Sequence, residues 1–248
     1  MLSDEELDRY QRHIVLKEVG GRGQAALKAA TVAVIGAGGL GSPCLQYLAA
    51  AGVGQITIID DDAVSLSNLQ RQVLFGTDDV GRPKVEAAAE RLQALNPHVV
   101  VEALPVRLTA ETAASLLSQH DVVADGCDNF RTRDAVNRAC VALGIPLVSA
   151  AIGPFEGQLG VFAGHLPDAP CYACYAGVPE DVPGTSCADV GVLGTVAGLI
   201  GAAQALEVLR LITGFGESRV GRLWLYEGLG VEARSIRVRK DPKCPVCC

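Results

Sequence analysis

The sequence has no basic stripe. Its 248 residues include 21 lysines and arginines against 28 aspartates and glutamates, which gives a formal net charge of −7. Nucleic-acid-binding proteins usually present a basic patch or stripe, whereas the cations of this chain are scattered. We therefore predict that the protein does not bind nucleic acid.

A targeting segment and a long apolar run are also missing. The N-terminal stretch MLSDEELDRY is polar and acidic, which excludes a signal peptide or a transit peptide. The longest uncharged run extends from Val190 to Leu206, and it is shorter than the ~20 residues that a membrane-spanning helix needs. These absences predict a cytoplasmic protein without a membrane partner.

The first 153 residues alternate between short strands rich in β-branched residues and helices. The expected strands are 31–36, 55–60, 98–104, 121–126 and 145–153, and the expected helices are 41–54, 84–97, 110–120 and 132–144. Such alternation is typical of a parallel sheet with helices on both faces. It predicts a doubly wound, Rossmann-like α/β fold.

The pattern changes after Gly153. Apolar and polar residues alternate in 155–164 and in 221–240, as they do in half-exposed antiparallel strands, and a long apolar helix at 191–212 lies between them. We expect the mostly parallel sheet to continue into these C-terminal antiparallel strands.

A glycine-rich turn follows the first expected strand. Gly36, Gly38 and Gly41 fit the pattern G-x-G-x-x-G, with Gly39 in addition, and Asp60 ends the second strand. Glycines let backbone N–H groups approach a phosphate at a helix N-terminus, and an acid at the end of the second strand can accept hydrogen bonds from ribose hydroxyls. The pattern predicts nucleotide binding; tight packing of helix on sheet is the alternative explanation.

Polar residues crowd the end of the second strand. Three aspartates at 60–62 are followed by Asn68 and Arg71, and Lys84 begins the next helix. Ser67 and Gln70 fit a capping box, so we expect a helical turn from Ser67 that places Asn68 and Arg71 on one face.

The polar residues at this strand end favour a nucleoside triphosphate over NAD. NAD needs one carboxylate here and a fairly apolar nicotinamide pocket, whereas two cations and several amides suit a triphosphate better. An NAD-dependent oxidoreductase remains the alternative. Asp128 follows the strand at 121–126 and should reach the same edge of the sheet, where it is a candidate magnesium ligand or simply a cap.

The nine cysteines include two C-x-x-C pairs, Cys171 with Cys174 and Cys244 with Cys247. Without a secretory signal the thiols should be reduced, and two such pairs can supply the four thiolates of a closed, structural zinc site. A redox dithiol or two unrelated pairs are the alternatives. Cys248 is expected to be spare, although it could replace Cys247.

The other cysteines have no such partners in sequence. Cys44, Cys127 and Cys140 are expected to be ordinary core residues. Cys187 lies in a stretch rich in Pro and Gly, where an exposed thiol could act as a nucleophile.

Taken in order, these motifs resemble one family over essentially the whole chain. RYQRHIVL, GAGGLGS, DDDAVSLSNLQRQ, GRPKVEAA, DGCDN, EGQLGVF and the paired C-x-x-C motifs are similar to the MoeB/ThiF/HesA adenylyltransferases of the ubiquitin-activating superfamily, closest to the MoeB type. The resemblance implies a single adenylation domain over 1–248, with an N-terminal helical arm at 1–28, a nucleotide-binding part at 29–153 and a zinc-binding part at 154–248. Members with a rhodanese-like domain continue well past the second C-x-x-C, so we expect that domain to be absent.

The resemblance also implies the roles of individual residues. Asp128 would engage Mg²⁺, and Arg12 would enter the active site of a partner subunit in a homodimer. Both would be catalytic, as would Arg71 and Lys84. The ATP-binding residues would be Gly39, Asp60, Ser67, Asn68, Leu69, Gln70, Arg71, Lys84, Asp128 and Asn129.

The implied reaction is adenylation of the C-terminal Gly-Gly carboxylate of a small ubiquitin-like sulfur carrier. The cofactors would be ATP, Mg²⁺ and a structural Zn²⁺, and the sulfur would come from another protein. The resemblance leaves the pathway open among molybdopterin, thiamin, cysteine and tRNA thiolation. A catalytically inactive scaffold of an activating complex would lack Asp128 or Arg71, and both are present.

Overall fold

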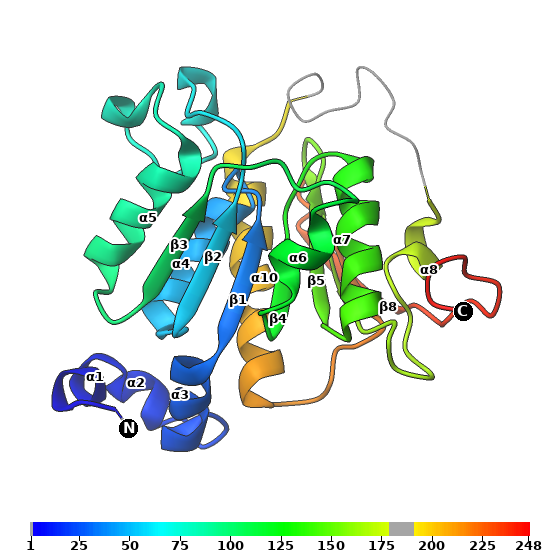
Figure 1. Ribbon diagram of the computed structural model, residues 1–248, viewed down its shortest axis with the longest axis horizontal. Coiled ribbons are helices and arrows are strands. Elements are labelled where there is room, and N and C mark those ends of the chain that lie inside the picture. The colour runs from blue at the N-terminus through cyan, green and yellow to red at the C-terminus, as the bar shows by residue number, and fades with distance from the viewer. Residues whose placement is uncertain (1, 179–190) are drawn as a thin grey trace.

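The computed structural model describes residues 2–178 and 191–248, and its eight strands form one sheet (Figure 1). The strand order is β3-β2-β1-β4-β5-β6-β7-β8. The five parallel strands are β1 (Thr31–Ile35), β2 (Gln55–Ile59), β3 (Val100–Leu104), β4 (Val122–Asp125) and β5 (Leu147–Ile152). The antiparallel strands are β6 (Glu156–Phe162), β7 (Arg222–Glu227) and β8 (Glu232–Arg237). The predicted fold class is therefore confirmed.

Helices cover both faces of the parallel part of the sheet (Figure 1). On one face lie α3 (Gly20–Ala29), α4 (Gly41–Ala51), α5 (Lys84–Leu95) and α10 (Gly194–Thr213), and on the other lie α6 (Ala113–Leu117) and α7 (Phe130–Leu143). Because side chains alternate along a strand, Val32 and Val34 join one core cluster while Ala33 and Ile35 join the other.

The remaining helices of the described residues are short. They are α1 (Asp4–Arg9) and α2 (Gln11–Ile14) in the N-terminal arm, α8 (Ala173–Ala176), and the 3-10 helices η1 (Leu66–Asn68) and η2 (Thr77–Asp79). The arm lies at the end of the sheet where β1 and β2 begin (Figure 1).

The α10 helix is the one helix within the described residues that is long and apolar enough to cross a membrane. Its residues Val196, Ile200 and Val208 are buried in the core of this fold. A Cβ atom on Gly201 would lie 2.3 Å from the carbonyl oxygen of Leu40, so α10 packs closely against the start of α4. Length and composition here fit a buried core helix.

Two local predictions were inaccurate. The helix expected at 110–120 is regular only over Ala113–Leu117. The helical turn near Arg71 begins after Ser65 rather than at Ser67, because Ser65 has extended backbone angles and its N–H donates to Asn68 Oδ1 at 3.4 Å. The capping box is thus formed by Ser65 and Asn68, and the pairing of Ser67 with Gln70 was wrong.

The strand order reverses direction between β1 and β4. From β1 the chain proceeds outward to β2 and β3, and it then returns to β4 on the other side of β1. Ligands of open α/β sheets bind at the carboxyl ends of the strands at such a switch point. The loops that follow β1, β2 and β4 meet there.

Candidate nucleotide-binding site

A cavity of about 660 Å³ opens at this switch point. Among the residues predicted from the sequence, its wall includes Gly39, Asp60, Arg71, Lys84, Asp128 and Asn129. Sequence reasoning missed other wall residues, notably Gln72, Arg107, Arg133, Gln158 and Tyr172. Ser67, Asn68, Leu69 and Gln70, together with Arg12, do not line the cavity.

The glycine turn forms one side of the cavity. Gly36 has φ of +89°, a value that side-chain-bearing residues rarely adopt. A Cβ atom on Gly41 would lie only 1.9 Å from the Gly36 carbonyl oxygen. The close approach supports the explanation by tight packing. The same turn also brings Gly38 and Gly39 to the cavity at the start of α4.

Asp60 is fixed beside this turn. Its Oδ2 accepts the Ala37 N–H at 2.7 Å, and its Oδ1 accepts the Asp62 N–H at 2.9 Å. Burial raises the pKa of the Asp60 carboxyl, and the charge of Lys84 opposes that shift. The carboxylate is thus oriented at the end of β2, where a ribose would be expected.

The next two aspartates neutralise cations. The Lys84 ammonium is buried and lies 2.7 Å from Asp62 Oδ2, and the Arg107 Nε donates to Asp61 Oδ2 at 3.0 Å. The oxygens of Asp60, Asp61 and Asp62 approach within 4.8 Å of one another, yet each carboxylate already has a partner. Because Asp62 is exposed, a phosphate could replace it beside Lys84.

The turn over 67–70 places Arg71 rather than lining the cavity. The Arg71 N–H donates to the Asn68 carbonyl at 3.0 Å, and its Nη1 donates to the Ser67 carbonyl at 3.2 Å. Its Cγ lies 3.4 Å from the position of a Cβ on Gly39. The guanidinium is therefore held over the glycine turn by the segment that we expected to contact ATP itself.

Gln72 follows on the inner side of this turn. Its side chain is 4% exposed, and the amide oxygen Oε1 has no hydrogen-bond partner among the residues that the structure describes. A buried polar atom without a partner costs about 1–3 kcal/mol. Gln72 is also one of the residues that line the cavity.

The loop after β4 supplies the opposite wall. The Asp128 side chain is exposed to the cavity, and in the described part of the chain its carboxylate accepts no hydrogen bond. Asn129 caps α7, since its Oδ1 accepts the Thr132 N–H at 2.9 Å. Asp128 is thus the carboxylate of this wall that is available to a cation.

A buried ion pair lies beneath this loop. Asp125 and Arg133 are 1% and 5% exposed, and Arg133 Nη1 donates to Asp125 Oδ2 at 3.1 Å. Cys127 was expected to be a core residue, but it is only partly buried and lines the cavity. Burial and the Asp125 charge raise the pKa of its thiol well above the usual value, so it is a poor nucleophile.

The other isolated thiols behave as expected where they are described. Cys44 and Cys140 are buried, and burial raises the pKa of each to about 12. Cys187 lies outside the described residues.

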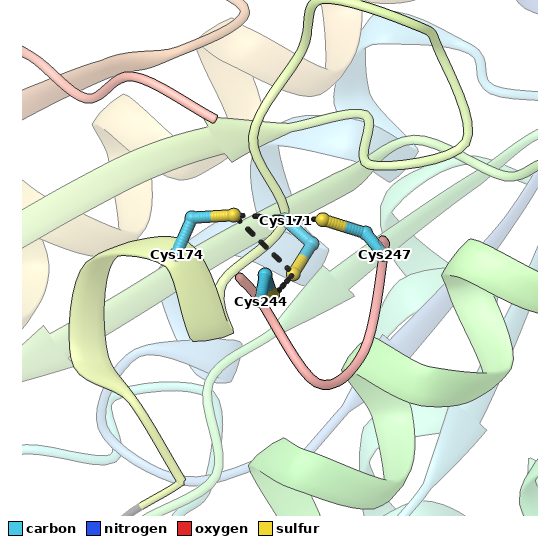
Figure 2. A group of neighbouring side chains, drawn as sticks. All are labelled: Cys171, Cys174, Cys244 and Cys247. Atoms are coloured by element: carbon cyan, nitrogen blue, oxygen red, sulfur yellow. Dashed lines mark hydrogen bonds between the residues drawn. The ribbon is translucent and has the colours of Figure 1, made fainter. Parts of the chain in front are cut away.

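The four predicted zinc ligands come together at the C-terminus (Figure 2). Their sulfur atoms all lie within 4.8 Å of one another. Cys171 is 3.9 Å from Cys174 and 3.6 Å from Cys244, and Cys174 is 3.5 Å from Cys247. Four thiolates in a tetrahedron with Zn–S distances of ~2.3 Å would be separated by about 3.8 Å, so the arrangement fits zinc.

Two of the four thiols accept hydrogen bonds of the kind that thiolates accept. Asn137 Nδ2 donates to Cys171 Sγ at 3.6 Å, and the Asp241 N–H donates to Cys174 Sγ at 3.5 Å. Burial raises the pKa of Cys171 and of Cys247, whereas at Cys244 nearby backbone N–H groups and thiols outweigh burial and lower the pKa to about 7. Cys248 is exposed, outside the cluster, and its thiol donates to the Asp241 carbonyl.

Arg12 is exposed on α2 and lies away from the cavity of its own chain. The turn that follows α2 exposes Val15 and Leu16, which are 67% and 49% accessible. An intrachain role of Arg12 in this cavity therefore has no support from the geometry.

A groove adjoins the cavity. It has a volume of about 590 Å³, runs over the carboxyl end of β5 and across β6, β7 and β8, and shares Ala151, Ile152 and Gln158 with the cavity. Small residues such as Ala151, Gly153, Gly157 and Ala233 contribute to its wall. A narrow chain lying in the groove would end at the nucleotide cavity.

Comparison with known proteins agrees with this geometry. The ThiF family profile matches residues 10–246. The chain is 50% identical to the sulfur carrier protein adenylyltransferase of Thermus thermophilus, covering 98% of this chain and 91% of that protein. It is 39% identical to the molybdopterin-synthase adenylyltransferase of Escherichia coli, covering 99% and 98%.

A solved structure extends the comparison to the fold. The crystal structure of E. coli MccB with AMPCPP and MccA has a TM-score of 0.84 and 25% identity, covering 97% of this chain and 74% of that one.

Proposed function

This chain belongs to the ThiF family, and from that premise we propose that it is an ATP-dependent adenylyltransferase acting on a ubiquitin-like sulfur carrier. The observation that supports this most directly is the joining of a cavity that contains Arg71 and Lys84 to a groove, at the shared residues Ala151, Ile152 and Gln158. An extended C-terminal Gly-Gly tail would lie in the groove and bring its carboxylate to the cavity. The T. thermophilus and E. coli relatives, a sulfur carrier protein adenylyltransferase and a molybdopterin-synthase adenylyltransferase, are both adenylyltransferases by name.

The chemistry follows from the cavity's charges. The carrier carboxylate attacks the α-phosphorus of ATP, an acyl-adenylate forms and pyrophosphate leaves. The carboxylate is ionised at neutral pH, so no protein base is required. Arg71 and Lys84 would neutralise the phosphates, with Lys84 exchanging Asp62 for a phosphate oxygen, and catalysis would consist mainly of positioning and charge stabilisation.

We assign the metal of this reaction to Asp128. Its exposed carboxylate faces the cavity, and oxygen ligands are those that Mg²⁺ prefers. A bound Mg²⁺ would supply further charge neutralisation to the phosphates. Asp60 would hold the ribose, and Gly39 and Asn129 would line the nucleotide. Ser67, Asn68, Leu69 and Gln70 would act by shaping the turn that presents Arg71.

Asp128→Ala tests the assignment. The variant should fold normally and lose pyrophosphate exchange by roughly a thousandfold, because removing a metal-positioning group costs several kcal/mol at the transition state. Normal exchange in Asp128→Ala would refute the assignment. Assays of the parent with a panel of carriers from the sulfur pathways would identify the substrate, and hydride transfer without pyrophosphate release would instead favour the oxidoreductase alternative.

The resemblance also leads us to propose a homodimer in which Arg12 enters the partner's cavity. The exposure of Arg12, and of Val15 and Leu16 beside it, supports an interface at this arm. Arg12→Ala chains mixed with Asp128→Ala chains should recover activity, since one site of each heterodimer would then be complete. Verified chain exchange without recovery would exclude action across the interface.

We further propose that the four cysteines bind one structural Zn²⁺. The sulfur separations support this, and the four protein ligands leave no open position for chemistry. Sulfur would then come from an external donor in the cytoplasm. Cys187 would not be needed for adenylation.

A further inference from the structure

The guanidinium of Arg133 joins three separate parts of the chain. Arg133 belongs to the first turn of α7, yet it is 5% exposed. Its Nη1 donates to Asp125 Oδ2 on β4 and, at 2.9 Å, to Ser149 Oγ on β5. Its Nη2 donates to the Ala150 carbonyl at 2.7 Å and to the Cys127 carbonyl.

One of these acceptors, the Cys127 carbonyl, belongs to a residue in the cavity wall, and another, the Ala150 carbonyl, directly precedes a wall residue. The Cys127 carbonyl is part of the peptide group that leads into Asp128, and that group is planar. Holding the carbonyl therefore fixes the orientation of the backbone that enters Asp128. The Cys127 N–H donates to Asp125 Oδ1 at 3.0 Å, so the same buried ion pair holds both sides of this residue.

The second wall is the end of β5. The Ala150 carbonyl directly precedes Ala151 and Ile152, two of the three residues shared by the nucleotide cavity and the groove. Arg133 thus connects the loop that presents Asp128 to the strand end where the carrier's tail would terminate. The ring of Tyr172 lies 5.9 Å from the guanidinium and also lines the cavity.

Stability alone is a weak reason for such a pair. Burying two charges costs about as much as their attraction returns, and well-packed apolar residues often stabilise a protein equally well. What an apolar pair could not do is bind two backbone carbonyls from different elements at once. The planar guanidinium, with its fixed set of donors, suits that task.

We propose that Arg133 is a positioning residue for adenylation. It orients the Asp128 loop against the end of β5, so that the nucleotide and the carrier carboxylate are correctly placed for reaction with each other. The proposal rests on the adenylation function proposed above. Although Arg133 lies in the cavity wall, it is only 5% exposed and its guanidinium is occupied by protein acceptors, so it would act through Asp128 rather than by binding the reactants.

Arg133→Lys tests this, since lysine retains the charge but cannot span both carbonyls. We expect the rate of pyrophosphate exchange to fall about a hundredfold, which is the effect of misplacing a reacting group by ~1 Å. The half-saturating Mg²⁺ concentration should rise about tenfold, and KM for ATP should change less than threefold. Arg138→Lys is the matched control, because Arg138 is exposed on the same helix and, within residues 2–178 and 191–248, its side chain pairs only with Asp134. It should leave all three quantities unchanged.

A double-mutant cycle separates positioning from general stabilisation. With Asp128 replaced by alanine, Arg133→Lys should change the exchange rate less than threefold, because the carboxylate that it positions is gone. Equal fold-losses in both backgrounds, or a loss that only matches the unfolded fraction, would overturn the proposal. If Arg133→Lys fails to fold, Ser149→Ala removes one contact of the guanidinium and should show the same dependence on Asp128; additivity there would likewise overturn it. Absence of exchange by the parent with every carrier would refute the proposed function instead.

Discussion

Removal of one cysteine from the four-thiol cluster should strongly destabilise the protein. Cys171 and Cys244 are 73 residues apart, so a metal that joins them closes a long loop in the unfolded chain. Treated like a disulfide of that loop length, the crosslink is worth about 4 kcal/mol. Cys244→Ser should therefore lose its zinc and about that much free energy of unfolding.

The measurement combines elemental analysis with urea unfolding. The parent should contain one zinc per chain, and its urea midpoint should exceed that of Cys244→Ser by more than about 1 M. Cys248→Ser is the matched control, because that thiol is adjacent in sequence but outside the cluster. It should retain both the metal and the midpoint.

Two results would refute this reasoning. Freshly purified, reduced parent protein without zinc would exclude the metal site. Zinc-loaded parent with the same midpoint as Cys244→Ser would show that the metal does not stabilise the fold. At temperatures where Cys244→Ser is folded, we expect its KM for ATP to stay within about threefold of the parent's, since Cys244 is not part of the cavity wall.

Three further outcomes are expected. The Lys28 hydrogen bond and the Ser3 N–H lower the pKa of Glu6 from 4.5 to about 2. The contribution of the Glu6 carboxylate to the free energy of unfolding is therefore complete above pH 4.5 and is lost as pH falls toward 2. The difference in that free energy between parent and Glu6→Gln should shrink from about 1–2 kcal/mol at pH 7 to near zero at pH 2. Gly41→Ala should destabilise by about 3 kcal/mol because its Cβ would overlap the Gly36 carbonyl, whereas Gly21→Ala, in open space on α3, should stabilise slightly in thermal unfolding. Cys187→Ala should keep pyrophosphate exchange within a few-fold of the parent, and loss of exchange would contradict this.

The sequence predicts the parts of this molecule that depend on local pattern. Alternating strands and helices determine the layers, and G-x-G-x-x-G with Asp60 determines where the cavity lies. The two C-x-x-C pairs predict a cluster because a metal site needs four ligands, whatever the path of the chain between them.

Side-chain direction within the polar turn was harder to predict. Both Ser65 with Asn68 and Ser67 with Gln70 have the spacing of a capping box, and the choice between them decides which residues face the cavity. The chain uses the first pair, so Arg71 faces the cavity while Ser67 and Gln70 remain outside its wall. The aspartates at 60–62 posed the same difficulty, because their partners Lys84 and Arg107 come from later elements.

Arg133 illustrates what the sequence can predict about a buried charge and what it cannot. Along α7, Arg133 shares a face with Val136, Asn137 and Cys140 at helical spacing, and all four are buried. An arginine on an apolar face indicates that a buried acceptor must exist, and that much can be read from sequence. Its acceptors, however, lie on β4, on the loop after it and on β5, and only the parallel pairing of these strands brings them together. The periodicity therefore identifies the buried charge, while the sheet topology determines which two walls of the site it joins.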